Sequence, residues 1–328
     1  MVPRSLPPGV FPLIANPGGT ASRARVVAAF LALYFLWGST YLFIKWTVAD
    51  IPPFVAAGLR HGTAGVLLYA WCRLRGAPRP TLKQWGMAAV VGTMLLAAGN
   101  GMVNWASQRV PSGLSALIVS SVPIWIVTVD WLRPHGTRPT GRTVAGLIVG
   151  SLGIAGLVWS AGGIGGRTSA ASAVMLACCG LLLGSLSWAS GSVLSRQLPR
   201  HPHGQLATSM DMIAAGVVLI PISWLTGDIA RFHPSAVSAT GWLSLAYLIT
   251  SGSLIGFSAY NWLLRVSTPS KVATYAYVNP IVAVALGWAL AGERLTPATF
   301  GAAALILAAV ALIAIPSRMA LREVFGAR

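Results

Sequence analysis

Long apolar segments separated by short hydrophilic gaps dominate this chain of 328 residues. A helix that crosses a bilayer needs about 20 mostly apolar residues, and ten segments approach or exceed that length. They cover residues 26–44, 54–73, 85–107, 111–132, 143–159, 171–194, 207–226, 241–264, 270–291 and 297–316. The gaps leave no room for a soluble domain. We therefore expect an all-α polytopic membrane protein with ten transmembrane helices.

The composition excludes the usual soluble classes and gives no sign of a metal or redox protein. Charged residues make up only 9% of the chain, against about 25% in soluble globular domains. The three cysteines, Cys72, Cys178 and Cys179, have no metal-ligand or redox spacing. The sequence contains no HExxH, P-loop or GxSxG motif. It predicts no catalytic residue, no metal site and no cofactor.

The basic residues predict the orientation of the chain in the membrane. The net charge of +17 is typical of nucleic-acid binding in a soluble protein. Here the basic residues stand in gaps between apolar segments, where they set topology. With a cytoplasmic N-terminus, seventeen lie inside and five outside. We therefore expect a multi-pass protein of the bacterial plasma membrane with both termini cytoplasmic. Its partners are the lipid bilayer and a small molecule rather than nucleic acid.

The two halves of the chain are similar in sequence. Uncommon residues recur in the same order, which disfavours the alternative of chance agreement between apolar stretches. The matches pair Trp37 with Trp188, Lys45 with Arg196, Arg60 with Asp211, Asn104 with Asn261 and Pro123 with Pro280. Each half has five spans, an odd number, so the second half enters the membrane from the opposite side. Such inverted repeats are typical of secondary transporters, whose substrate binds near the midplane between the repeats.

This duplication predicts the domain organisation. The Pro- and Gly-rich residues 1–25 form a disordered cytoplasmic head. Residues 26–160 form the first five-helix repeat, 161–170 a linker, 171–316 the second repeat and 317–328 a cytoplasmic tail.

Two prolines fall near the middle of corresponding spans. Pro123 and Pro280 each remove a backbone hydrogen bond and crowd the preceding turn. A Pro-interrupted span at matching places in both halves indicates the binding site of a transporter. We interpret both as hinges beside a cavity; the alternative is a packing kink without contact to substrate.

Polar and aromatic residues within the spans are the candidates for a substrate cavity. Asn279 lies one helical turn beyond Tyr275, so both face one side of their helix. Asn100 is the deepest of a polar stripe in the third span. Trp37 and Trp188 stand at equivalent positions, each followed by small or hydroxyl residues. The alternatives are interhelical hydrogen bonds for the amides and helix packing for the indoles.

Arg60 and Asp211 are the candidates for charge or ion coupling. A charge at the bilayer centre costs about 2.5–3.5 kcal/mol on insertion scales, so such residues usually face a partner or water. Snorkelling or a structural hydrogen bond is the alternative for Arg60, and interfacial solvation for Asp211. Asp130 with Arg133, and Glu293 with Arg294, are interpreted as local charge pairs.

Ordered blocks of sequence between residues 30 and 316 resemble a known family. They include LYFLWGSTYLFIKW from Leu33, MDMIAAGVVL from Met210 and ATYAYVNPIVAVALGWALAGERL from Ala273. The chain resembles the ten-span EamA-type members of the drug/metabolite transporter superfamily, and among them the YedA-like inner-membrane proteins. The resemblance implies a ten-helix basket with a central cavity and export of metabolites or drugs. Its recurring elements fall on Trp37–Thr40, Arg60, Asp211-Met212, Asn279-Pro280 and Gly292-Glu293. The first half departs from the last element, because Thr137 follows Gly136.

The sequence therefore favours a secondary transporter that exports a small organic solute, an amino acid-like metabolite or a drug, by alternating access. A proton is the candidate coupling ion, and the oligomeric state stays open. One alternative is an intramembrane enzyme that uses His61 with a nearby hydroxyl such as Thr63. Another is a non-transporting membrane scaffold.

Overall fold

The computed structural model describes residues 22–134, 136, 138–162, 169–267, 272, 274–294 and 296–314. Most of the predicted head, most of the predicted linker and the predicted tail lie outside these residues. Every element in the described part of the chain is a helix, which confirms the all-α fold class.

The helices of the first half follow the apolar segments closely. They are α1 (Arg23–Asp50), α2 (Pro53–Leu74), α3 (Leu82–Gly92), η1 (Thr93–Asn100), α4 (Gly101–Ala106), α5 (Ser112–Val119), α6 (Val122–Leu132) and α7 (Gly141–Gly162). α1 begins at Arg23, so the last residues of the predicted head are already helical.

The second half repeats this order. It contains α8 (Ser169–Ser195), α9 (Gly204–Leu225), α10 (Asp228–Arg231), η2 (Pro234–Ala236), α11 (Ala239–Tyr247), η3 (Leu248–Ile255), α12 (Gly256–Val266), α14 (Tyr275–Ala291) and α15 (Pro297–Ala314). The short elements α10 and η2 lie between the second and third long helices of this half and have no counterpart in the first.

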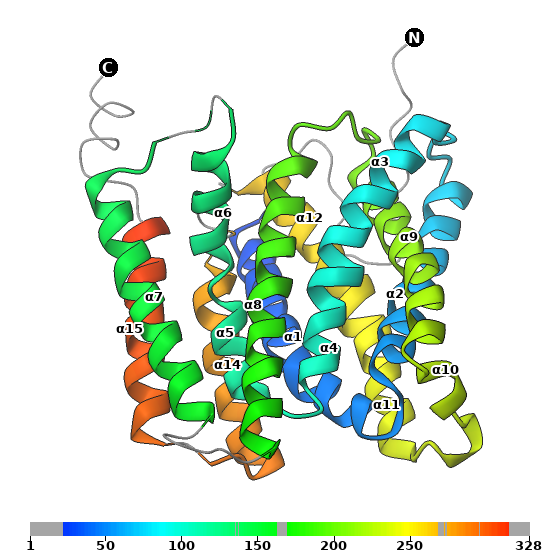
Figure 1. The fold of residues 1–328 in the computed structure, drawn as a ribbon. Coiled ribbons are helices and arrows are strands. Elements are labelled where there is room, and N and C mark those ends of the chain that lie inside the picture. Colours follow the sequence, from blue (N-terminus) through cyan, green and yellow to red (C-terminus); the bar gives the residue numbers. More distant parts are fainter. Residues whose placement is uncertain are drawn as a thin grey trace, which may run out of the picture.

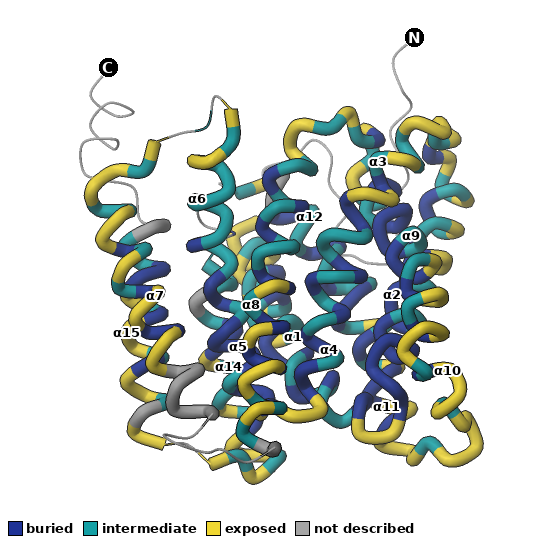
Figure 2. The backbone as a smooth tube through the Cα atoms, in the orientation of Figure 1, coloured by how far each residue is buried: buried dark blue, intermediate teal, exposed yellow. Residues whose placement is uncertain are grey.

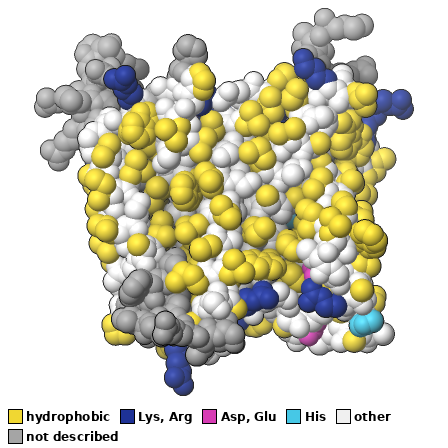
Figure 3. Space-filling model, viewed as in Figure 1, with side chains coloured by type: hydrophobic (Ala, Val, Ile, Leu, Met, Phe, Trp, Pro, Cys, Tyr) yellow, Lys and Arg dark blue, Asp and Glu magenta, His cyan; other side chains and the backbone are white. Residues whose placement is uncertain are grey.

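Six of the described helices are long and apolar enough to cross a membrane. Three shorter apolar helices cover residues 141–156, 278–291 and 299–312. Large apolar side chains on the outside of the bundle agree with a lipid environment, since Phe35, Val66 and Trp288 are each more than half exposed. Figure 3 shows apolar side chains over the middle of the molecule and Lys and Arg side chains at its upper and lower rims. The chain is a polytopic membrane protein, and the total of ten crossings stays a prediction.

The long helices run up and down through the bundle, and two pairs of equivalent helices from the two halves lie side by side (Figure 1). α2 packs along α9, and α7 packs along α15. α1 packs against α11, α12 and α14 of the second half, while α8 packs against η1, α4 and α6 of the first. In Figure 1 α1 descends from the upper end, whereas α8 rises from the lower end. This arrangement fits two repeats of opposite direction.

Glycines allow the closest approach between the halves, where α2 meets α9. A Cβ atom added at Gly216 would lie 2.8 Å from the Cα of Gly62, and one added at Gly65 would lie 2.7 Å from the backbone nitrogen of Ile213. Lipid provides no hydrophobic driving force between helices, so membrane helices associate through close packing of this kind. The helix contact therefore depends on glycine at these positions.

The third span of each half contains a π-helical segment, η1 in the first and η3 in the second. Such segments are rare and are frequently found at functional sites. Their wider turn displaces the side chains and carbonyl groups that follow. Figure 2 shows that buried and intermediate residues predominate in the interior of the bundle.

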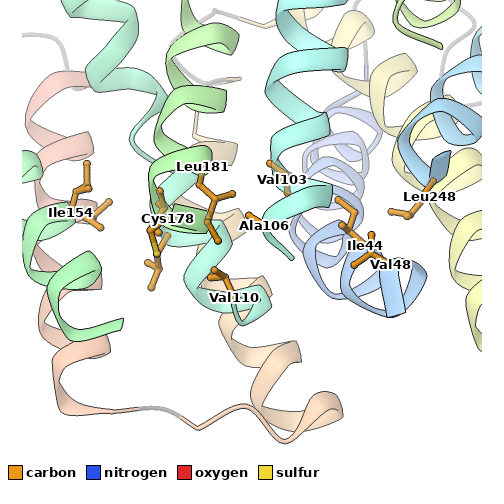
Figure 4. Close-up of a cluster of buried hydrophobic side chains, with 14 of the residues drawn as sticks. Ile44, Val48, Val103, Ala106, Val110, Ile154, Cys178, Leu181 and Leu248 are labelled. Atoms are coloured by element: carbon orange, nitrogen blue, oxygen red, sulfur yellow. The ribbon is translucent and has the colours of Figure 1, made fainter. Parts of the chain in front are cut away.

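A large cluster of buried apolar side chains lies between the helices (Figure 4). Ile44 and Val48 of α1 and Val103 of α4 belong to it, together with Leu181 of α8. These side chains are between 0% and 6% exposed. The cluster joins helices from both halves, and Ile44 and Val103 also line the cavity described next.

Candidate functional site

A cavity of about 300 Å³ lies between the two halves. This volume is at the lower end of the range for sites that bind small molecules, about 300–1,000 Å³. Its walls come from α1, α2, η1, α4, α5 and α6 of the first half and α8, α12 and α14 of the second. Among the lining residues are Trp37, Thr40, Tyr41, Ile44, Arg60, His61, Gly99, Asn100, Val103, Ala116, Ser120, Pro123, Val127, Ser185, Trp188, Arg196, Phe257, Tyr275, Ala276, Asn279 and Pro280.

The sequence candidates for substrate contact, for hinges and for charge coupling meet at this cavity, except Asp211. The five candidates for substrate contact, both prolines and Arg60 belong to its lining, whereas Asp211 does not. Their roles toward a solute stay predictions; their common location is a property of the structure.

Trp37 lies at the centre of an aromatic group in the cavity wall. Its indole N–H donates to the carbonyl oxygen of Gly252 in η3 at 3.1 Å. Its ring centroid lies 5.1 Å from that of Phe257, 5.3 Å from Tyr260 and 5.0 Å from Tyr275. The contacts with Phe257 and Tyr275 are edge-to-face, a favourable geometry for aromatic pairs. The polar edge of Trp37 is thus satisfied, and its ring offers an apolar surface to the cavity.

A polar network around Arg60 joins α2 to η1, α4 and η3. The side-chain oxygen of Asn100 accepts from Arg60 Nη1 at 3.5 Å and from Asn104 Nδ2 at 3.1 Å, and it lies 3.3 Å from His61 Nε2. Arg60 Nε donates to Ser253 Oγ of η3 at 3.1 Å. The two π-helical segments therefore position the acceptors that hold Arg60.

The two prolines affect their helices differently. In the first half, α5 ends at Val119, a turn follows, and α6 begins at Val122 with Pro123 in its first turn. The predicted interruption is present there. In the second half Pro280 lies inside the continuous helix α14. With the amide of Asn279 turned so that its nitrogen faces the neighbouring carbonyl groups, this nitrogen donates to the carbonyl oxygens of Tyr34 at 3.3 Å and Tyr275 at 3.1 Å. Asn279 thus makes the interhelical bond considered as its alternative and also lines the cavity.

Asp211 lies in α9 outside the cavity lining. Its carboxylate forms an ion pair with Arg200, which belongs to the connection between α8 and α9. Asp211 is only 5% exposed, and one of its oxygens has no hydrogen-bond partner. It is therefore buried rather than solvated at the interface. Arg60 and Asp211 occupy equivalent positions in the repeats, yet they form no ion pair with each other.

Below the lining residues of the lower end, three hydrogen bonds converge on one carboxylate, that of Glu293. Lys45 Nζ donates to Glu293 Oε1 at 2.7 Å. The backbone nitrogens of Ser112 and Gly113 at the start of α5 donate to the same carboxylate at 2.7 and 3.1 Å. Ser112 lies one turn before Ala116 in the cavity wall. The Glu293 network thus ties α1, α5 and the end of α14 together directly below the cavity.

The expected local pair of Glu293 with Arg294 was wrong, because the fold brings Lys45 to the carboxylate instead. Burial raises the pKa of Glu293, but the bond from Lys45 and the two backbone N–H groups of Ser112 and Gly113 outweigh it. The net result is a pKa below the usual 4.5. A carboxylate at a helix N-terminus also interacts favourably with the helix dipole. The other local pair, Asp130 with Arg133, is present at 2.7 Å.

The upper end of the cavity continues into a second hollow. This hollow has a volume of about 310 Å³ and shares Ile126, Val127 and Arg196 with the cavity. Asp130 and Arg138 also line it. Arg196 is exposed and forms no ion pair within the described part of the chain. The cavity is therefore more open at its upper end than at its lower end.

His61 and Thr63 are not brought together. His61 is fully buried beside Asn100, while Thr63 is exposed on the outside of α2. Among the described residues no group of three His, Cys, Asp or Glu side chains has the geometry to hold a metal ion. The hydroxyl partner suggested for an intramembrane enzyme is therefore on the wrong face of the helix.

Sequence reasoning missed Tyr41, Phe257 and Ser253. Tyr41 follows the Trp37–Thr40 block by one residue and lies one helical turn after Trp37, so its periodicity was a usable signal. Ser253 faces Arg60 only because η3 is π-helical, and no residue pattern distinguished that segment.

Comparison with known proteins identifies the class to which this fold and cavity belong. The family model described as the EamA-like transporter family matches twice, over residues 24–159 and 175–315. The two matches cover most of the chain, one in each half. The chain belongs to the EamA-like transporter family.

Relatives and a solved structure agree with this assignment. The chain is 40% identical over 286 residues to the uncharacterized inner membrane transporter YedA of Escherichia coli K12, covering 87% of this chain and 89% of that protein. It is 25% identical over 294 residues to a probable amino-acid metabolite efflux pump of the same organism, covering 87% and 93%. A crystal structure of a protein 22% identical to this chain has the same fold, with a TM-score of 0.61 and coverage of 92% and 99%.

Proposed function

We propose that this protein is a secondary transporter that exports a small organic solute, an amino acid-like metabolite or a drug, across the bacterial plasma membrane. The observation that carries the proposal is the cavity of about 300 Å³ whose walls come from both repeats. A site between inverted repeats can face either side of the membrane when one repeat rocks against the other.

The open end of the cavity is the end at which an exported solute would have to enter. The cavity's open upper end is the end at which α1 begins, and the basic residues predict that this end is cytoplasmic. A cavity open to the cytoplasm can load a cytoplasmic solute while the Glu293 network keeps the opposite end closed. The relatives carry the names of transporters and of an efflux pump.

Counterflow in proteoliposomes tests the proposal. Vesicles with purified protein are preloaded with unlabelled amino acids or cationic drugs, and the uptake of the labelled solute is compared with empty vesicles. Ala276→Trp fills the cavity wall and should abolish the uptake. Val66→Trp, on the exposed face of α2, is the matched control and should retain it. No flux of any solute above empty vesicles contradicts the proposal.

Asp211 is the residue we propose for proton coupling. It is buried, with one oxygen bonded to Arg200 and the other without a partner. Asp211→Asn should leave counterflow intact, because exchange needs no net proton movement. It should abolish transport driven by a pH gradient. Equal gradient-driven transport by both proteins contradicts this role.

A further inference from the structure

Arg60 is a buried cation without an anionic partner. It is 3% exposed, and its two hydrogen-bond acceptors, Ser253 and Asn100, are neutral. It forms no ion pair with any carboxylate in the described part of the chain. A guanidinium group carries five N–H donors, and these two bonds use only two of them. The group therefore has unused donors at the cavity wall.

The charged residues that line the cavity are all basic. Arg60 and Arg196 are the charged lining residues, and no Asp or Glu belongs to the lining. A charge away from water is costly unless a charge of opposite sign accompanies it. The cavity thus disfavours a cationic occupant and favours one that carries a negative charge to Arg60.

The equivalent residue in the other repeat, Asp211, has the counter-ion that Arg60 lacks. Asp211 corresponds to Arg60 and is also buried, but Arg200 from its own half neutralises it. Asp211 is outside the cavity, whereas Arg60 lines it. The ionisable group without a protein counter-ion is the one that a solute can reach.

The rest of the cavity suits an apolar, flat molecular body. Trp37, Tyr275 and Phe257 present rings on one side, and Trp188 lines another part of the wall. Aromatic side chains provide large contact areas for such a body. We propose that Arg60 binds the carboxylate of the solute, and that the solutes are monocarboxylates with an aromatic or aliphatic body. This inference rests on the proposed transport function.

Three probes with one body and different charge test the inference. They are 3-phenylpropanoate, its neutral amide 3-phenylpropanamide and the cation 3-phenylpropylamine. Their binding to the full chain, purified in detergent, is measured by calorimetry. We expect the carboxylate to bind at least tenfold more tightly than the amide, because charge-assisted bonds to a guanidinium are stronger than neutral ones. The amine should bind most weakly.

Variants assign the preference to Arg60. Arg60→Gln should abolish the difference between carboxylate and amide while the affinity for the amide stays within about threefold, which also shows that the variant is folded. Arg60→Lys should retain part of the preference, since lysine keeps the charge but loses the planar fork. Arg75→Gln removes a basic residue that stacks on Trp71 away from the cavity and should retain the full preference.

Several results would overturn the inference. They are equal binding of carboxylate and amide by the unmodified protein, an undiminished preference in Arg60→Gln, or binding of none of the three probes. If Arg60→Gln does not fold, Arg60→Met takes its place as the neutral variant, and an undiminished preference there has the same meaning. Counterflow separates this failure from that of the proposed function. If a neutral or cationic solute is transported and carboxylates are not preferred, the transport function stands and the proposed role of Arg60 is wrong. If the protein binds carboxylates through Arg60 but transports no solute, the role of Arg60 stands and the proposed transport function is wrong.

Discussion

The two ends of the cavity are held differently, although they belong to related halves of the chain. At the lower end Glu293 joins Lys45 to the first turn of α5. At the upper end Arg196, the repeat counterpart of Lys45, is exposed and forms no ion pair in the described part of the chain. The position that corresponds to Glu293 is Thr137 in the sequence. The repeats share a fold, but only the second supplies the carboxylate that can close an end in this way.

Under the proposed alternating access, this difference predicts that the two ends open at different free-energy cost although the backbones of the repeats are related. A transporter that alternates must break the closure at one end and form another at the opposite end. At the lower end opening must break three bonds to one carboxylate, each of them charge-assisted. We therefore expect the lower end to be the more costly of the two to open, and substitutions in the Glu293 network to have larger effects than those at Arg196.

Glu293→Gln should have the largest effect. The substitution keeps the size of the side chain and removes its charge, and hydrogen bonds to charged groups contribute about 1.5–3 kcal/mol. We expect the lower end to open at least tenfold more often, since 1.4 kcal/mol corresponds to a factor of ten. The measurement is the rate at which maleimide labels Ser115→Cys in a chain whose three native cysteines are replaced by alanine. Ser115 is 0% exposed and its hydroxyl has no partner, so a thiol there reports opening.

Asp50→Asn is the matched control for the loss of one negative charge at the same end. Asp50 accepts a bond from the backbone nitrogen of Ser238 at 3.2 Å and has no contact with the Glu293 network. Labelling in this variant should stay within twofold of the parent. Equal labelling rates in Glu293→Gln and the parent would mean that the carboxylate does not hold the lower end closed.

Lys45→Gln should have a smaller effect. The side chain of Lys45 is 33% exposed, and partly exposed ion pairs contribute at most about 1 kcal/mol. Glu293 also keeps its two bonds from Ser112 and Gly113 in this variant. We expect labelling of Ser115→Cys to rise no more than about fivefold. An effect as large as that of Glu293→Gln would show that the lysine, not the helix terminus, dominates the closure.

Acidification should weaken the closure of the lower end only when the pH falls below the usual 4.5 of a glutamate carboxyl group. The pKa of Glu293 in the closed state is below its usual 4.5. The ionised carboxylate therefore stabilises the closed state, and this stabilisation is fully present above pH 4.5. The contribution is lost as the pH falls through the lowered pKa. Labelling of Ser115→Cys should therefore change less than twofold between pH 7 and pH 5, after correction for maleimide reactivity. Further acidification should raise it toward the rate of Glu293→Gln, whose own rate should stay constant.

The sequence predicted the helices and most of the cavity because both depend on local or periodic signals. The apolar segments gave helix bounds within a few residues for most helices, and Trp37, Asn100 and Tyr275 were found from their spacing and repeat matches. The family match confirms the two-repeat architecture. These features follow from which residues are adjacent along a helix.

The ion pairs and the π-helical segments could not be predicted in the same way. Glu293 stands beside Arg294 in the sequence but pairs with Lys45, 248 positions away, because packing of α1 against α14 brings the two together. Asp211 pairs with Arg200 only because the connection between α8 and α9 folds back over it. The segments η1 and η3 have ordinary apolar sequences, so nothing local indicates their wider turn.

Arg196→Gln should have the smallest effect and gives the most direct test of the difference between the ends. Arg196 corresponds to Lys45 in the repeat, but it has no carboxylate to lose in this conformation. Labelling of Ser115→Cys should therefore stay within twofold of the parent. A change of fivefold or more would contradict the comparison. If the rate fell, Arg196 would have to stabilise the alternate state, in which the lower end is open, through an ion pair that forms only there. The upper end would then have an electrostatic closure of its own, equivalent to that of Glu293 despite Thr137, and the two repeats would be alike in energetics as well as in fold.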